Sequence, residues 1–170
     1  GSEMGGHGMQ IFDLTQLLNV QCDNEYYCVE FNPRENVYAG TSNHPVTRSH
    51  NIVANEGTDF VYIVGGGSKL VYNSGGNGCE GGLHIVDVSD PKNPTFAGCY
   101  GGDGYVHDAE CVVYDGVDTR YDGNEICFCF NENSVTIVDV TDKTDFKLLS
   151  RTLYSLSLIH ISEPTRPTRI

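Results

Sequence analysis

Two histidines occupy the same place in two successive segments of the chain, and their side chains are candidate metal ligands. His50 begins the segment HNIVANE, and His107 begins the segment HDAECVVY with Asp108 directly after it. Imidazole nitrogens and carboxylate oxygens are groups that bind zinc and other transition metals. The sequence therefore indicates a metal site with His50, His107 and Asp108 as ligands. The alternative interpretation is that each histidine satisfies buried backbone groups, since only two imidazoles are visible in the pattern.

A second group of candidate ligands lies in the segment DGVDTRYDG, which contains Asp115, Asp118 and Asp122. Calcium takes about six to eight oxygen ligands, so carboxylates gathered in one loop are suitable for it, although their spacing differs from that of an EF-hand. The competing interpretation is a solvated turn in which aspartate side chains bond to nearby backbone amides. A divalent metal, calcium or zinc, is thus the only class of cofactor that these residues suggest.

The sequence contains no arrangement typical of nucleophilic catalysis. The GxSxG motif is absent, and the serine beside His50 has no identifiable acid and base partners. Cys111 lies in a predicted strand rather than at the start of a helix, so no helix terminus activates its thiol. We assign no catalytic residue, and enzymatic activity is the minority interpretation.

The elements that position these residues follow from a strand template that occurs three times. Residues 9–14 read MQIFDL, residues 83–88 read LHIVDV and residues 135–140 read VTIVDV, each followed by Thr or Ser. β-Branched side chains favour strands, and apolar residues at both odd and even positions indicate a strand covered on both faces. After the second and third copies, turn residues and a further extended run predict a hairpin.

The segments between the template copies also repeat. From His50 to the second copy, and again from His107 to the third, the chain reads as two strands separated by Gly-containing turns. Each unit then has four antiparallel strands in roughly 40–60 residues, which is the pattern of a β-propeller blade. The first strand of a blade lies nearest the axis, so both histidines are expected near one central channel. The predicted fold is all-β, a partial β-propeller of four-stranded antiparallel blades that holds the end of one blade and two further blades.

Four segments resemble the choice-of-anchor B family, whose blades carry repeats of the LVIVD type. They are GGHGMQIFDL, SHNIVANE, CEGGLHIVDVSDPKNPTFAGC and GYVHDAECVVYDGVDTRYDGNEICF. The resemblance spans residues 1–154 and implies a secreted or cell-surface β-propeller, usually without an assigned enzymatic activity. Cys22, Cys28 and Cys129 depart from the family pattern, as does the irregular segment 21–48.

The predicted organisation places a partial propeller in residues 1–155. Residues 1–20 are the end of a blade, residues 21–49 an irregular insertion between two sheets, and residues 50–106 and 107–155 two blades. Within the insertion, residues 32–49 are predicted to form a loop. Residues 156–170 lack the repeat pattern and resemble the translation of a transposase adapter used to make sequencing libraries, so we expect native sequence to stop near Ser155. The alternative is a natural basic tail.

Seven cysteines without a CxxC pair favour disulfides in an oxidising compartment over a zinc knuckle. Cys79 precedes the template strand and Cys99 ends its hairpin partner, so antiparallel pairing brings them to the same end of the blade. Cys111 faces Cys127 or Cys129 across the next hairpin, and the family-like EICF favours Cys127. We therefore expect Cys79 with Cys99 and Cys111 with Cys127. The competing pattern is Cys99 with Cys111, and a further alternative is seven reduced, buried thiols.

Charge and hydropathy limit the classes of partner. With 23 acidic and 10 basic residues the net charge is −13, which argues against nucleic acids and anionic membranes. No apolar run is long enough to span a bilayer, and the start lacks a charged and then apolar signal sequence.

The sequence therefore predicts a non-catalytic extracellular propeller, secreted or at the cell surface, that acts as a binding or structural module. Its expected partners are the remaining blades of the same propeller and a protein or glycan surface. The alternative is a propeller hydrolase or lactonase-like enzyme with a metal in the central channel, held by His50, His107 and ligands from other blades.

Overall fold

The computed structural model describes Gly6 and residues 8–20, 22–24, 27–28, 35–66 and 79–154. In these ranges the regular structure is β-strand apart from one short 3₁₀ helix, so the fold is all-β as the sequence predicts. The tail of residues 156–170, for which a non-native origin is expected, lies outside the described residues.

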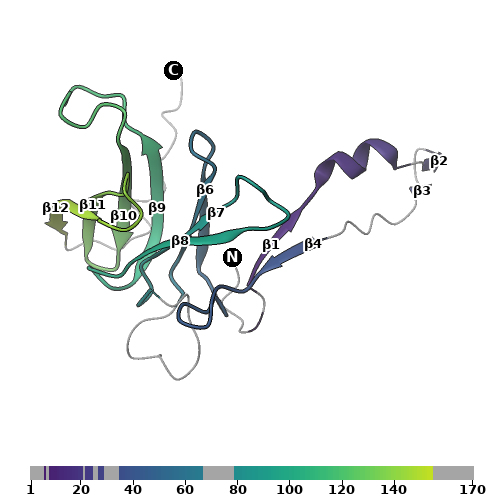
Figure 1. The fold of residues 1–170 in the computed structure, drawn as a ribbon, viewed down its shortest axis with the longest axis horizontal. Coiled ribbons are helices and arrows are strands. Elements are labelled where there is room, and N and C mark those ends of the chain that lie inside the picture. The colour runs from purple at the N-terminus through teal and green to yellow at the C-terminus, as the bar shows by residue number, and fades with distance from the viewer. Residues whose placement is uncertain are drawn as a thin grey trace, which may run out of the picture.

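The middle of the chain forms a four-stranded antiparallel sheet, called sheet 1 (Figure 1). Its strands are β5 (Asn51–Asn55), β6 (Phe60–Val64), β7 (Leu83–Asp87) and β8 (Thr95–Tyr100), and they pair in chain order. The second template copy forms β7, in the interior of the sheet, where paired neighbours on both edges and packing on both faces suit its continuous apolar run.

The last part of the chain forms a second sheet of the same design, called sheet 2, beside sheet 1 (Figure 1). It contains β9 (Val106–Val113), β10 (Glu125–Asn131), β11 (Ser134–Asp139) and β12 (Lys147–Leu153), again antiparallel and in chain order. The third template copy supplies β11, the third strand of sheet 2, as β7 is the third strand of sheet 1.

The first template copy pairs with a strand that the sequence did not predict. β1 (Met9–Phe12) is antiparallel to β4 (Glu35–Tyr38), within the segment predicted as a loop. Between them lie the 3₁₀ helix η1 (Leu14–Asn19) and a short pair formed by β2 (Cys22–Asn24) and β3 (Tyr27–Cys28). The extra residues therefore lie inside the β1–β4 hairpin rather than between two sheets. The loop prediction failed because the partner that orders β4 is distant in sequence.

Every copy of the template ends in the same local turn. The carboxylates of Asp13 and Asp139 each accept hydrogen bonds from both the backbone amide and the hydroxyl of the threonine two residues later. The carboxylate of Asp87 accepts a bond from the amide of Ser89 at 2.9 Å. These bonds compete with the strand ladder and end it, so the Asp-x-Ser/Thr pattern marks the end of the strand.

The two template hairpins share an irregularity. The ladder of β7 and β8 shifts register between Ile85 and Val86, and the ladder of β11 and β12 shifts between Ile137 and Val138. Both shifts follow the third residue of the template. A β-bulge at the same position in two hairpins is evidence that sheets 1 and 2 are copies of one structural unit.

Two apolar cores lie on opposite faces of sheet 1. One face, with Leu83 and Ile85, packs against sheet 2, and the other face, with Val86, packs against Met9 of β1 and Tyr38 of β4. Gly98 of β8 allows a close approach between the sheets, since a Cβ atom built there would lie 2.3 Å from the carbonyl oxygen of Lys143. The elements therefore form a row of three units: β1 with β4, then sheet 1, then sheet 2.

Candidate functional site

The two histidines singled out from the sequence lie side by side in the structure. His50 directly precedes β5, and its backbone amide donates to the carbonyl of Val64 at 2.9 Å. His107 is the second residue of β9. The ring centroids of His50 and His107 are 4.2 Å apart with the planes inclined by 42°, and the ring of Tyr105 lies 6.4 Å from that of His50. Both histidines are partly exposed. The junction of β5 and β9 thus brings together the two imidazoles.

The third expected ligand, Asp108, bonds across the junction of the two sheets. Its Oδ1 accepts a bond of 2.7 Å from the side-chain amide of Asn51 and one of 2.8 Å from the backbone amide of Ala109. In the part of the chain that the structure describes, no three His, Cys, Asp or Glu side chains converge as metal ligands. The described geometry therefore offers a histidine pair rather than a complete three-ligand centre.

The aspartates proposed for calcium lie in the loop between β9 and β10. Asp118 forms a two-pronged ion pair with Arg120, with nitrogen–oxygen distances of 2.9 and 2.7 Å, and these bonds lower the pKa of its carboxyl. The other two, Asp115 and Asp122, are exposed. Asp118 thus acts here as a turn and ion-pair residue, and calcium binding by this loop stays a prediction.

One disulfide joins the bend before β7 to β8, and the other joins β9 to β10. Cys79 is bonded to Cys99 with a Cα–Cα distance of 5.4 Å, and Cys111 is bonded to Cys127 with a Cα–Cα distance of 4.1 Å. These are the two pairs expected from the sequence. Cys129 is free and buried, and burial raises the pKa of its thiol to about 12, so the reactive thiolate is strongly disfavoured.

A buried carboxylate that the sequence analysis missed connects the two sheets. Oε1 of Glu125 accepts hydrogen bonds of 2.6–2.7 Å from Asn55, Thr58 and Tyr62 of sheet 1 and its turn, and Oε2 pairs with Lys143 at 2.6 Å. Burial acts to raise the pKa of Glu125, but the ion pair and the three donors outweigh it, and the pKa is lowered. The signal in the sequence was a lone charge beside the apolar run ICFCF.

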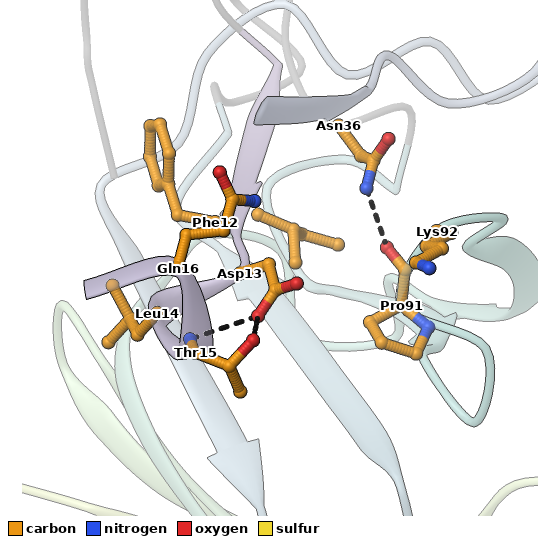
Figure 2. Close-up of a pocket in the computed structure, with 9 residues that line it drawn as sticks. Phe12, Asp13, Leu14, Thr15, Gln16, Asn36, Pro91 and Lys92 are labelled. Atoms are coloured by element: carbon orange, nitrogen blue, oxygen red, sulfur yellow. Dashed lines mark hydrogen bonds between the residues drawn. The ribbon is translucent and has the colours of Figure 1, made fainter. Parts of the chain in front are cut away.

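A pocket of about 910 Å³ opens between two parts of the chain (Figure 2). One part is the end of β1 with the first residues of η1 and the start of β4, and the other is the turn between β7 and β8. Its lining combines apolar side chains with amide, carboxylate and ammonium groups: Ile11, Phe12, Asp13, Leu14, Thr15, Gln16, Asn36, Pro91 and Lys92. Figure 2 shows Asn36 facing Pro91. The side-chain amide of Asn36 donates a hydrogen bond of 3.4 Å to the backbone carbonyl of Pro91. The sequence analysis missed this pocket because its walls are distant in sequence.

Buried polar atoms without a hydrogen-bond partner point to further contacts. Within the described ranges these atoms are Nε of Arg48, Nδ1 of His107 and Oδ1 of Asn131. Orphaned buried groups are uncommon in folded proteins and call for an explanation such as a bound ion or water. Of the three, only the His107 atom belongs to the candidate metal site.

The repeated sheets define an all-β protein built from similar units, and comparison with known families agrees with that class. The family model of the LVIVD repeat matches residues 79–101, which contain β7, β8 and both cysteines of the first disulfide. Neither a curated protein nor a solved structure matches the chain. No helix among the described residues is long and apolar enough to cross a membrane.

Proposed function

We propose that the chain is part of a β-propeller that acts as a non-catalytic binding or structural module outside the cell. In this proposal sheets 1 and 2 are neighbouring blades within residues 50–106 and 107–155. β1 and β4 are the outer two strands of the preceding blade, with residues 13–34 inserted in their hairpin. The resemblance to choice-of-anchor B proteins supports a secreted or cell-surface setting.

One observation carries the propeller proposal: each unit covers the same face of the unit before it. The first and third template residues of sheet 1, Leu83 and Ile85, are fully buried under sheet 2. Their counterparts in sheet 2, Val135 and Ile137, are partly exposed. A ring of blades repeats one interface between successive sheets, so the exposed face of sheet 2 is where the next blade belongs.

The extracellular setting rests on the disulfides. Both bridges close short loops, with sequence separations of 20 and 16 residues. Stable disulfides are typical of secreted and surface proteins and rare in the cytosol. Peptide mapping without reduction, on protein from its native source, should recover the four cysteines as these two pairs. Recovery of four free thiols would contradict the extracellular assignment.

The chemistry of the pocket favours binding over catalysis. Apolar surface with a few polar groups at the rim is the usual composition of a ligand site. The hydroxyl of Thr15 donates to Asp13 at 2.6 Å as part of the template turn, and none of the described residues that line the pocket is a histidine that could act as its base. A protein or glycan surface remains the proposed partner class. The hydrolase alternative depends on a metal at His50 and His107 together with ligands from other blades.

The propeller proposal is tested on the full chain through its exposed sheet face. Wild-type protein should bind a hydrophobic dye and self-associate, because Phe128, Phe130, Val135 and Ile137 lie on one partly exposed face of sheet 2. Phe128→Lys should reduce dye binding and self-association while leaving the circular dichroism spectrum unchanged. A monomeric wild-type protein that binds no dye would contradict an uncovered blade face.

A further inference from the structure

We infer that His50 and His107 form a binding site for a divalent cation that prefers tetragonal nitrogen coordination, such as Cu²⁺ or Ni²⁺, at the junction of sheets 1 and 2. The site goes beyond the proposed binding-module function and does not depend on catalysis. It uses one ring nitrogen of each imidazole, and water completes the coordination.

The distance between the rings is short enough for both imidazoles to bind one ion. With metal–nitrogen bonds of about 2.0–2.1 Å, two imidazoles on one tetrahedral zinc have ring centroids roughly 5 Å apart. Two imidazoles at adjacent corners of a square-planar ion are closer, with centroids about 4.5 Å apart. The centroids of His50 and His107 are 4.2 Å apart. The separation is nearer to that of adjacent square-planar ligands than to that of tetrahedral ones, and we take Cu²⁺ as the probe for that reason.

The second observation is the unsatisfied nitrogen of His107. Its Nδ1 is buried and has no hydrogen-bond partner among the described residues. An imidazole nitrogen in that state loses its interaction with water and gains nothing in return, and a bound cation is one of the groups that restores the loss. Both residues are partly exposed, although Nδ1 of His107 itself is buried.

Charge and the surroundings also suit a cation. The chain carries a net charge of −13, which raises the local concentration of cations at its surface. Asp108, next to His107, bonds to Asn51 across the sheet junction and fixes β9 against β5 beside the pair. The histidines come from two different sheets, so an ion bound by both would link neighbouring units of the fold.

The test is titration of the full chain with Cu²⁺, followed by calorimetry and electron paramagnetic resonance. The tightest site should show a tetragonal spectrum with two equatorial nitrogens. His50→Gln and His107→Gln should each weaken that site at least tenfold, and the matched variant His44→Gln, whose ring stacks on Phe96 instead, should not. Because most nitrogen sites bind Cu²⁺ more tightly than Zn²⁺, the spectrum rather than the order of affinities tests the geometry.

Folding of the variants is checked separately. His107→Phe keeps an aromatic ring against His50 but removes the nitrogen, so it should retain the wild-type circular dichroism spectrum and lose the site. Unchanged copper affinity in the His50→Gln/His107→Gln double variant, or a spectrum with fewer than two nitrogens, would overturn the inference. Either result would leave the dye-binding test of the sheet 2 face unaffected, so failure of this site and failure of the propeller proposal are distinguishable.

Discussion

The same substitution at equivalent positions of the two sheets should have very different effects on stability. Ile85 and Ile137 are the third residues of the template in β7 and β11, and each precedes the β-bulge of its hairpin. Ile85 is 0 % exposed beneath sheet 2, whereas Ile137 lies on the partly exposed face. Alanine at either position removes the same atoms from the same kind of strand. The difference in unfolding free energy between the two variants therefore measures the effect of being covered by a neighbouring sheet.

The expected magnitudes follow from burial. Ile85→Ala should cost about 2–5 kcal/mol, the usual range for emptying a fully packed aliphatic site. Ile137→Ala should cost about 1 kcal/mol, because its side chain already meets solvent and leaves no closed cavity. A difference of about 2 kcal/mol corresponds to roughly 4–8 °C in the melting temperature of a protein of this size.

The measurement is urea denaturation of the oxidised full chain, followed by circular dichroism, with a third variant as control. Val138→Ala removes a fully buried side chain from β11 itself, so it should cost about 2 kcal/mol if sheet 2 is well packed against sheet 1. Equal costs for Ile85→Ala and Ile137→Ala would refute the argument that the outer face of sheet 2 lacks its cover. A negligible cost for Val138→Ala would instead show that sheet 2 is loosely packed.

Three further predictions concern the contacts within and between the units. Glu125→Gln should cost about 3 kcal/mol at pH 7, because it leaves the Lys143 ammonium buried without its partner. Folding lowers the pKa of Glu125, so the stability that its carboxylate contributes is present above about pH 4.5 and is lost as the pH falls through the folded-state pKa. The variant should therefore lose less unfolding free energy than the wild type between pH 5 and 2, and parallel curves would contradict the role of the carboxylate. Gly98→Ala should lower the unfolding free energy by about 1–3 kcal/mol in thermal melts, because the new Cβ would lie 2.3 Å from a backbone oxygen. The control Gly57→Ala, whose Cβ would have its nearest contact at 3.4 Å, should lower it far less. The reverse order of the two losses would contradict the close approach of the sheets. Replacing Cys111 and Cys127 together by alanine should cost about 3 kcal/mol in denaturant, as expected for a short closed loop, and an unchanged midpoint would show that the bridge does not constrain the unfolded chain.

Much of the fold was predictable from the sequence because it depends on local chemistry. The Asp-x-Ser/Thr turn has only one residue between its bonded groups, so Asp87 and Ser89 mark the end of β7 without knowledge of its neighbours. The Cys111–Cys127 pair was predictable once β9 and β10 were recognised as adjacent strands, since the antiparallel register places those residues opposite each other. These features require a hairpin and its register, which local patterns specify.

Features that depend on the packing of separate units were not predictable in the same way. β4 was expected to be a loop, because its residues ENVY show little alternation and their partner, β1, lies more than twenty residues earlier. The role of Glu125 required three donors from sheet 1, and no spacing in the sequence relates those residues to it. The contact between His50 and His107 was anticipated only through the repeat, which placed them at equivalent strand starts.

The repeat also relates the junction that holds the pocket to the junction between sheets 1 and 2. The ladders align Tyr38 of β4 with Tyr100 of β8, because each pairs with the first residue of its template strand, and Asn36 therefore corresponds to Gly98. Counting from the template aspartate, Pro91 in the turn of sheet 1 corresponds to Lys143 in the turn of sheet 2.

The Asn36–Pro91 and Gly98–Lys143 contacts are thus the same interface made twice with different residues. At the second junction the glycine lets the backbones of β8 and the following turn meet closely. At the first, the Asn36 side chain reaches across to the Pro91 carbonyl, and the pocket lies beside it (Figure 2). Asn36 therefore places a side chain at the position where Gly98 leaves the backbones of the next junction in close contact. The repeated contact thus varies between the two junctions, while the Asp-x-Ser/Thr turns that end both template strands stay the same.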